Sequence, residues 1–385
     1  MIGKLRPVGS RVALPGRDDS LALPWEKFYR SEYMGSGTQA LSFAVAIAIQ
    51  GKSKTPDPEV IIPAYGCPDL VAAVVAQNAR PVLVDLVPNS PYMSDVGIRK
   101  AITSSTVALV AVGFLGMSER LNLLAEICAE NNILLIEDSA QCFPPASSYK
   151  PFADCIVLSF GRGKPINLMG GGGLLLRRSM AEEAISNLRR YPVKALTIGK
   201  AWFVKRKIFN LLLARIPYYM LEKIPLLGIG DTRFHKLQHL FRLRIPKNLL
   251  LAGIHSFYSR PQIHLRYNTE LKVLNKFGWR CLTNDLDGGS WQASNHRMLR
   301  YPVLAPSMDM RERAVDALNA AGIGASRFYG QSLDQVDGVS EWLTRGDYPV
   351  AKDFAARLFT LPTHEDVRSA DVFLVAEILS GLRQG

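Results

Sequence analysis

Residues 158–173, LSFGRGKPINLMGGGG, join the end of an apolar strand to a glycine-rich loop that holds a single lysine, Lys164. Gly163 and Pro165 flank Lys164 and both disfavour a helix, so Lys164 is not expected to lie on the exposed face of one. Glycine also lets a ligand approach the backbone closely. A lysine in a partly dry pocket can lose its proton and form a Schiff base with a carbonyl group. Taken alone, however, the loop favours an ordinary solvated lysine.

Short apolar runs alternate with helical patterns between about residues 59 and 178. Several runs are apolar throughout, as in strands covered on both faces by helices. The predicted strands are Val60–Pro63, Pro81–Asp85, Val107–Val112, Ile133–Asp138, Cys155–Ser159 and Gly173–Leu176. Segments between them, such as 69–77 and 119–131, have helical length and periodicity. The alternation predicts a mostly parallel α/β sheet flanked by helices.

Two further polar clusters fall where ligands bind such a sheet, at the strand ends. In GSGTQAL, residues 35–41, backbone N–H groups at a helix start and the Ser36 and Thr38 hydroxyls could hold a phosphate. In IEDSAQ, residues 136–141, Asp138 ends a strand and could hold a protonated ring nitrogen or a metal. Ordinary helix capping would explain either cluster alone.

The three clusters together meet the requirements of pyridoxal 5'-phosphate (PLP). Its phosphate needs a cradle, its ring nitrogen needs a carboxylate that keeps it protonated, and its aldehyde needs a lysine. The prediction of PLP therefore rests on the combination of the three clusters.

The sequence resembles the DegT/DnrJ-type PLP-dependent sugar aminotransferases of the fold type I superfamily over most of the chain. The motifs are SGT at 36–38, EVIIPAY at 59–65, RPVLVD at 80–85, IEDSAQ at 136–141, SFGRGK at 159–164 and LPTH at 361–364. The spacing from Ser159 to Lys164 and from Asp138 to Gln141 matches the family's pattern. The resemblance implies a mostly parallel, seven-stranded-type sheet flanked by helices, with a smaller C-terminal α+β domain.

The resemblance also implies a role for each motif residue. Lys164 would form the Schiff base and then carry a proton between carbon atoms of the cofactor. Asp138 would pair with the pyridine nitrogen, and Gln141 would contact the ring or its hydroxyl. The phosphate would be bound by Ser36, Gly37, Thr38 and Ser159, and Tyr65 would stack on the ring.

The implied reaction moves an amino group from an amino acid, usually glutamate, to a keto group of a nucleotide-linked sugar for polysaccharide or glycan synthesis. The family's dehydratases have histidine at the position of Lys164, which argues against a dehydration. An alternative of a different class is a non-catalytic PLP-fold protein docked on a membrane or an enzyme complex. The family further implies a homodimer with its sites at the dimer interface.

Three positions depart from the family's pattern. An Asn-x-Arg-Met signature usually precedes the long helix, and its asparagine reaches the phosphate of the neighbouring subunit, but residues 243–246 are LRIP. Either Arg244 or Lys247 replaces that asparagine, or the contact is lost. Gly113 stands where the family has histidine, and the glycine run 170–173 lacks the usual acidic residue. These changes bear on the substrate side more than on the cofactor side.

The chain has 385 residues, of which 48% are hydrophobic and 21% charged, so it is expected to be globular and multidomain. Its net charge of +12 is confined to residues 189–247, which contain 14 Lys and Arg residues but only two acidic residues, Glu222 and Asp231. We predict a large PLP-binding domain at 1–188 and a basic, apolar-rich insertion at 189–247. A long linking helix and a small C-terminal domain would occupy 248–385. The helical pattern of the linking helix runs from after Pro246 to about Lys276. In the C-terminal part, the patterns predict a strand at 300–305 and helices at 308–321, 351–358 and 367–382.

The basic insertion interleaves aromatic residues and leucines with cations, as do segments that lie in a membrane interface. Each basic residue near anionic lipid contributes on the order of 1 kcal/mol, which would favour a contact through 200–230. Alternatively, the apolar residues pack on the large domain or across a dimer, and the cations form a solvated face or a mouth for a diphosphate substrate. No nucleic-acid-binding motif accompanies the charge, so no nucleic-acid partner is predicted.

The five cysteines form no CxxC pair and have no histidine at metal-ligand spacing, so neither a disulfide framework nor a metal site is predicted. The N-terminus lacks the apolar core of a secretory signal. These features predict a cytoplasmic protein, with the inner face of the membrane as the place where the basic insertion could dock.

Overall fold

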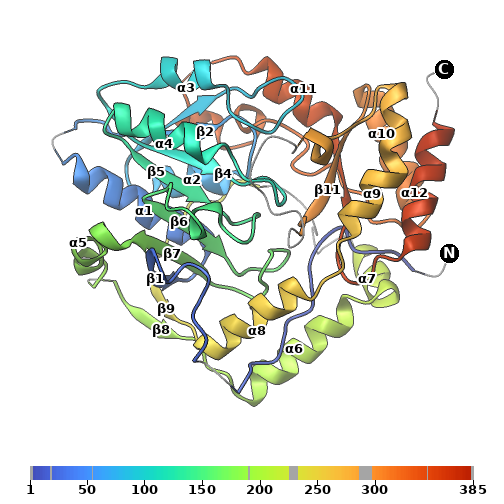
Figure 1. The fold of residues 1–385 in the computed structure, drawn as a ribbon, viewed down its shortest axis with the longest axis horizontal. Coiled ribbons are helices and arrows are strands. Elements are labelled where there is room, and N and C mark those ends of the chain that lie inside the picture. Colours follow the sequence, from blue (N-terminus) through green and yellow to red (C-terminus); the bar gives the residue numbers. More distant parts are fainter. Residues whose placement is uncertain are drawn as a thin grey trace.

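A nine-stranded sheet forms the centre of the part of the chain that this computed structural model describes, residues 3–17, 20–53, 55–189, 191–224, 233–285, 297–344 and 346–382 (Figure 1). The strand order is β3-β2-β4-β5-β6-β7-β1-β9-β8. The parallel strands are β2 (Glu59–Pro63), β3 (Arg80–Val84), β4 (Thr106–Val112), β5 (Leu134–Asp138) and β6 (Cys155–Ser159). Antiparallel β7 (Gly172–Arg177) and β1 (Tyr29–Met34) complete seven strands. The short β8 (Val193–Ala195) and β9 (Arg242–Arg244) extend the sheet from the basic insertion.

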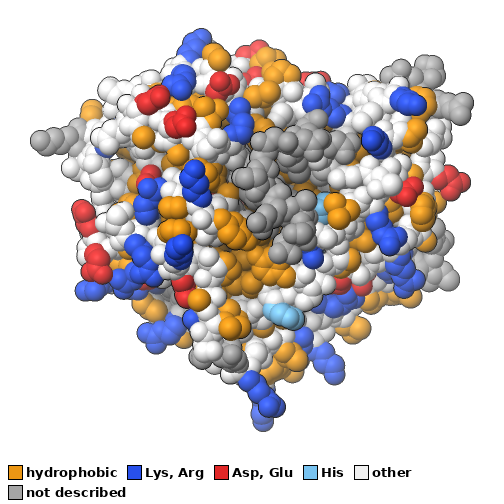
Figure 2. Space-filling model, viewed as in Figure 1, with side chains coloured by type: hydrophobic (Ala, Val, Ile, Leu, Met, Phe, Trp, Pro, Cys, Tyr) orange, Lys and Arg blue, Asp and Glu red, His pale blue; other side chains and the backbone are white. Residues whose placement is uncertain are grey.

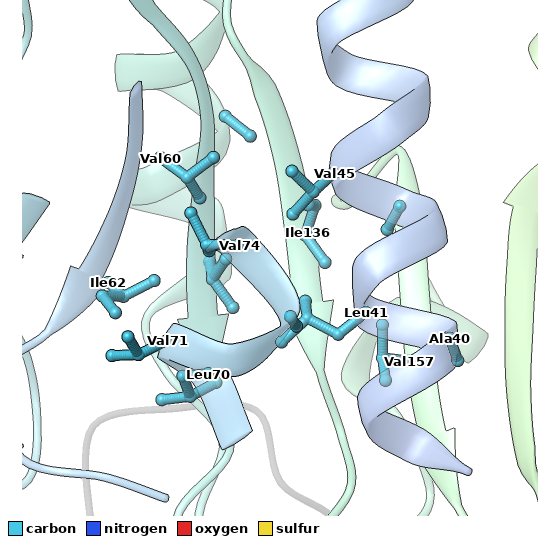
Figure 3. Packing of buried hydrophobic residues seen from close by; sticks show 14 of the residues in the cluster. Ala40, Leu41, Val45, Val60, Ile62, Leu70, Val71, Val74, Ile136 and Val157 are labelled. Atoms are coloured by element: carbon cyan, nitrogen blue, oxygen red, sulfur yellow. The ribbon is translucent and has the colours of Figure 1, made fainter. Parts of the chain in front are cut away.

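Helices cover both faces of the sheet, because alternate residues of each buried strand point to opposite sides. Val60 and Ile62 of β2 pack against α1 (Gly37–Gly51) and α2 (Asp69–Val75), as Figure 3 shows. Ile61 faces the other way, into the cluster that contains α3 (Asp95–Ala101) and α4 (Leu121–Glu130). Each large aliphatic side chain buried here contributes about 1.5–3 kcal/mol. The predicted apolar strands are confirmed.

A second, antiparallel sheet consists of β10 (Arg280–Cys281), β11 (Arg300–Leu304) and β12 (Leu358–Pro362). One of its faces packs on α9 (Ile263–Leu271), α10 (Met308–Ala320) and α12 (Ser369–Gly381), through residues such as Tyr301 and Val303. Leu304 and α11 (Pro349–Arg357) join the main core on the opposite side. The predicted strand at 300–305 and the predicted helices at 308–321, 351–358 and 367–382 are confirmed. The division of the chain at 188 and 247 stays a prediction.

The predicted continuous helix from Pro246 to about Lys276 is wrong. The structure has α8 (Lys247–Tyr258), a break at residues 259–262, then α9 and a 3-10 turn at Lys272–Phe277. Pro261 explains the break, because proline lacks a backbone N–H and disfavours helical geometry in the preceding residue. The hydrophobic period continues across the break, which is why the pattern resembled one helix.

The basic insertion forms β8, α6 (Lys200–Leu212), α7 (Arg215–Glu222) and β9, while residues 225–230 of the predicted membrane contact lie outside the described residues. The N-terminal segment runs between α6 and α8 (Figure 1). Asn210 of α6 accepts a hydrogen bond from the Val12 backbone N–H at 2.8 Å, and Asn248 of α8 donates one to the Gly16 carbonyl at 3.0 Å. None of the described helices has the length and apolar character needed to cross a bilayer.

Candidate active site

A pocket lies at the carboxyl ends of the parallel strands β4, β5 and β6, where a sheet of this kind binds its ligands. Seven of the eight predicted site residues line it, namely Gly37, Thr38, Tyr65, Asp138, Gln141, Ser159 and Lys164. The eighth, Ser36, lies at the start of α1 and caps the helix, because its hydroxyl accepts a hydrogen bond from the Gln39 N–H at 3.1 Å. The pocket also contains Cys67, Asp69 and Tyr329.

The start of α1 approaches β6 and β7 more closely than any side chain on Gly37 or Gly172 would permit. A Cβ on Gly37 would lie 2.8 Å from Cβ of Ser159, and a Cβ on Gly172 would lie 2.3 Å from the Ser36 carbonyl oxygen. The first turn of α1 contains no acidic residue. Unpaired N–H groups and the positive end of the helix dipole therefore meet the Ser159 hydroxyl, which is the chemistry that binds a phosphate.

We predict that Gly37→Ala weakens PLP binding, because the added methyl group separates α1 from Ser159. Overpacking of this kind costs about 1–3 kcal/mol, so the dissociation constant should rise roughly tenfold. Absorbance titration of cofactor-free protein with PLP measures the effect. Gly51→Ala is the matched control, since it lies at the other end of α1 and its Cβ would meet no atom within 4 Å. Equal PLP affinity in the two variants would contradict the assignment.

Asp138 is the last residue of β5, and its side chain is buried. Its Oδ1 accepts a hydrogen bond from the Ala140 N–H at 2.9 Å. Burial raises the pKa of this carboxyl group, while the Ala140 N–H and the positive charge of Lys164 act in the opposite direction. No ion pair involves Asp138 within the described part of the chain. A buried carboxylate of this kind fits a ligand that presents a protonated nitrogen.

Lys164 lies in the loop between β6 and β7, and its backbone N–H donates to the Gly161 carbonyl at 3.3 Å. Phe160 closes the loop, because its carbonyl accepts hydrogen bonds from Leu168 at 2.9 Å and Gly170 at 3.1 Å. Burial raises the pKa of both Asp138 and Cys67, and the positive charge of Lys164 is close enough to oppose this in both cases. The amine and the carboxylate therefore face the same pocket.

Gln141 and Tyr329 form another part of the pocket wall. Gln141 Nε2 donates a hydrogen bond to the Tyr329 hydroxyl at 2.6 Å, and its Oε1 accepts one from the Leu115 N–H at 3.4 Å. Tyr329 and its neighbour Phe328 have φ angles of 47° and 42°, which non-glycine residues seldom adopt and which tend to occur at functional sites. Tyr65 donates from its hydroxyl to the Phe328 carbonyl at 2.9 Å, so its ring is fixed against this wall.

Three pocket residues were not anticipated from the sequence. Asp69 accepts a hydrogen bond from the Thr38 hydroxyl at 2.8 Å, so this hydroxyl is already engaged beside the phosphate cradle. Cys67 lies two residues before Asp69 in the chain, and burial raises the pKa of the Cys67 thiol to about 11. Tyr329 belongs to a loop that is 165 residues from Lys164 in the chain. No local sequence pattern identified it as a pocket residue. Asp69 gave only the ordinary signal of an acidic residue in the first turn of a helix.

The groups present fit PLP at three points: the start of α1 with Ser159, the buried Asp138, and Lys164. The engaged Thr38 hydroxyl is the one group of the cradle that would have to turn from Asp69 to reach a phosphate. The backbone N–H groups of α1 and the Ser159 hydroxyl remain for this purpose. The geometry therefore supports the cofactor through the helix and β6 rather than through Thr38.

Comparisons with known proteins place the chain in a family. The model of the DegT/DnrJ/EryC1/StrS aminotransferase family matches residues 33–206 and 251–380. A dTDP-4-dehydro-2,3,6-trideoxy-D-glucose 4-aminotransferase of Saccharopolyspora spinosa is 31% identical over 148 residues, which cover 37% of this chain and 36% of the relative. A UDP-2-acetamido-2-deoxy-3-oxo-D-glucuronate aminotransferase of Pseudomonas aeruginosa is 22% identical over 332 residues, which cover 84% of this chain and 79% of the relative.

Among solved structures, Helicobacter pylori PseC, an aminotransferase involved in the biosynthesis of pseudoaminic acid, has the same fold. The two structures superpose with a TM-score of 0.71. Their sequences are 16% identical, and the match covers 98% of each chain. The unmatched residues 207–250 include α7 and most of the basic insertion. The predictions of fold type I architecture and of a PLP-dependent aminotransferase family are confirmed, and the chain belongs to the DegT/DnrJ/EryC1/StrS aminotransferase family.

Proposed function

We propose that the protein transfers an amino group from an amino acid, with glutamate as the donor, to a keto group of a nucleotide-linked sugar. The observation that carries the proposal is the single pocket that brings Lys164, Asp138 and the start of α1 together. The names of two relatives, from S. spinosa and P. aeruginosa, describe aminotransferases for dTDP- and UDP-linked dehydro or oxo sugars. We propose that the aminated product serves polysaccharide or glycan synthesis.

Bound PLP supplies an electron sink that stabilises negative charge on the carbon next to the substrate nitrogen. Asp138 would hold a proton on the ring nitrogen, and Ser159 with the backbone of α1 would hold the phosphate. Lys164 Nζ is the one amine that lines the pocket among the described residues, so it would bind the aldehyde and then move the substrate proton. Gln141, fixed by Tyr329 and Leu115, would orient the ring hydroxyl. Tyr65, held by its hydrogen bond to the Phe328 carbonyl, would stack on the ring.

Spectroscopy tests the proposal. The PLP-loaded protein should be yellow, glutamate should bleach it, and a nucleotide-linked keto sugar from a panel with dTDP, UDP and GDP should restore the colour. Mass spectrometry of the sugar then identifies the aminated product. A colourless protein that cannot be reconstituted with PLP, or a yellow protein that glutamate leaves unchanged, would contradict the proposal.

We further propose a homodimer in which Arg244 takes the place of the missing asparagine. Of the two candidate cations, Lys247 lies 3.5 Å from the Glu26 carboxylate of its own chain, whereas Arg244 is exposed at the end of β9. An exposed arginine can reach a phosphate bound by a second copy of the chain. Sedimentation of the purified protein tests the dimer.

We also propose that α6 and α7 contact an anionic membrane surface. Ile208, Leu211 and Met220 are 52%, 65% and 66% exposed, which is unusual for large apolar side chains. Helix α6 carries three lysines and no acidic residue, and Lys and Arg side chains project from the lower edge of the molecule, where α6 lies (Figures 1 and 2). Exposed apolar residues beside cations are complementary to acyl chains and anionic headgroups.

The double variant Ile208→Glu/Leu211→Glu should lose at least about ninety per cent of binding to anionic vesicles, because it removes apolar contact and adds repulsion. Flotation with phosphatidylserine-containing vesicles measures the binding, and neutral phosphatidylcholine vesicles should bind little of either protein. Leu265→Glu is the matched control, since Leu265 is also exposed but lies on α9. A variant that floats like the wild type would exclude lipid. A variant that instead dissociates a dimer would assign the surface to a second copy of the chain.

A further inference from the structure

Arg300 is a partly buried cation beside the pocket, and no carboxylate within the described residues forms an ion pair with it. Its Nη1 donates a hydrogen bond to the Thr360 hydroxyl at 3.3 Å. Its guanidinium carbon lies 5.0 Å from the centre of the Phe328 ring. These two contacts, with one hydroxyl and one ring face, leave most of the five N–H donors of Arg300 without a negatively charged acceptor.

The strand geometry determines where Arg300 points. Tyr301 and Val303 of β11 belong to the core shared with α9, α10 and α12. Since side chains alternate along a strand, Arg300 projects to the opposite face, together with Leu304, which packs in the main core. That face looks toward the large sheet and the pocket.

Backbone contacts place this end of β11 against the pocket wall. The Leu299 N–H donates to the Leu115 carbonyl at 2.8 Å, and the Leu115 N–H donates to Gln141 of the pocket at 3.4 Å. The Phe328 ring under Arg300 lies 4.1 Å, centre to centre, from the Tyr329 ring that lines the pocket. Arg300 therefore lies one layer of side chains behind the part of the pocket wall that Tyr329 forms.

Burial lowers the pKa of the Arg300 guanidinium to about 10, and nearby Tyr329, Tyr218 and Tyr65 act against this. The group remains a cation at neutral pH. A cation withdrawn from water without a counter-ion is unfavourable unless a ligand supplies the missing charge. Tyr218 belongs to α7, so the region around Arg300 extends from the pocket toward the basic insertion.

We propose that Arg300 binds an anionic group of the substrate, either a carboxylate of the amino donor or the diphosphate of the nucleotide-linked sugar. This inference rests on the proposed function for the identity of the two substrates. A guanidinium binds carboxylates and phosphates through paired hydrogen bonds, which would orient the substrate relative to Lys164. Arg300 is thus assigned as a positioning residue rather than one that takes part in proton transfer.

Direct binding tests this assignment without turnover. Calorimetry of the PLP-loaded protein with glutarate represents the donor carboxylates, and calorimetry with inorganic pyrophosphate represents the diphosphate. Arg300→Gln should weaken the binding of one of the two ligands at least about tenfold, and Arg300→Lys should weaken it less. The ligand whose affinity falls shows whether Arg300 binds the donor carboxylate or the sugar diphosphate. Arg280→Gln, at an exposed position of neighbouring β10, should leave both affinities unchanged. Unchanged binding of both ligands to Arg300→Gln, or no binding to the wild type, would overturn the assignment.

The two half-reactions give a second measurement. If Arg300 binds the donor, Arg300→Gln should raise the KM for L-glutamate at least about tenfold while the slow reaction of glutamate diamide, which has no carboxylate, stays the same. If it binds the sugar, the KM for the keto sugar should rise instead. Equal losses with glutamate and its diamide would indicate a structural defect and would overturn the assignment. If the wild type binds the ligands but neither half-reaction occurs, the proposed function fails and the assignment of Arg300 as an anion site stands.

Discussion

Lys164→Ala should lower the rate of amino transfer by at least about 10,000-fold, because it removes both the amine that bonds to the cofactor and the base that moves the substrate proton. None of the other side chains that line the pocket in the described structure is an amine. Steady-state production of the amino sugar measures the rate, and the absorption spectrum shows whether the yellow colour is lost.

The matched control is Lys100→Ala, in which the exposed lysine at the end of α3 is removed. It should retain the wild-type rate and colour. Added methylamine offers a sharper test, since an external amine that enters the space left by Lys164 should restore part of the proton transfer. A Lys164→Ala enzyme within tenfold of the wild type would exclude the assigned role.

Asp138→Asn should lower the rate at least about 100-fold, because a neutral amide does not hold a proton on the pyridine nitrogen and the ring then accepts electrons poorly. PLP should still bind through its phosphate and Lys164. The expected loss is therefore in kcat, measured by steady-state kinetics, with a smaller change in cofactor affinity. A loss in cofactor affinity alone would assign Asp138 to binding rather than to the chemistry.

The same variant should make the cofactor-free protein more stable. Burial raises the pKa of Asp138 in the folded chain above its value in the unfolded chain, so folding takes up a proton and stability falls as pH rises through this interval. Asparagine keeps the size and removes the charge. The melting temperature of cofactor-free Asp138→Asn should therefore exceed that of the wild type by a few degrees at pH 8, and the difference should shrink as pH falls toward 4. A stability difference that grows at low pH would contradict the burial of an unpaired carboxylate.

Asp138 and Lys164 could be predicted because each lies next to an apolar strand with a clear end. In a parallel sheet, the carboxyl ends of neighbouring strands meet at one edge, so residues distant in sequence could be placed together before any coordinates. The strands themselves were recognisable because burial on both faces requires continuous apolar runs. Strand β1, YRSEYM, which lies between β7 and β9, gave no such run and was not predicted.

The part of the pocket wall around Tyr329 could not be derived in this way. Tyr329 comes from a loop and Arg300, which lies behind it, comes from strand β11 of the second sheet. Only the packing of that sheet on the first brings them near the cofactor side. The residue types of Phe328 and Tyr329 do not indicate the positive φ angles that both adopt. Pro261 did give a signal for the helix break, but the hydrophobic period on both sides outweighed it.

The position of Cys67 has a practical consequence for experiments on this protein. Of the five cysteines, Cys128, Cys142, Cys155 and Cys281 are buried, and Cys67 alone is partly exposed, within the pocket. Because the pKa of its thiol is raised to about 11, little thiolate exists at neutral pH and alkylating reagents should react slowly. A maleimide or iodoacetamide should still label Cys67 before the other four cysteines, because those are buried, although the reaction needs long incubation or raised pH. Protection of Cys67 from labelling would then report occupancy of the pocket in preparations too dilute for absorbance.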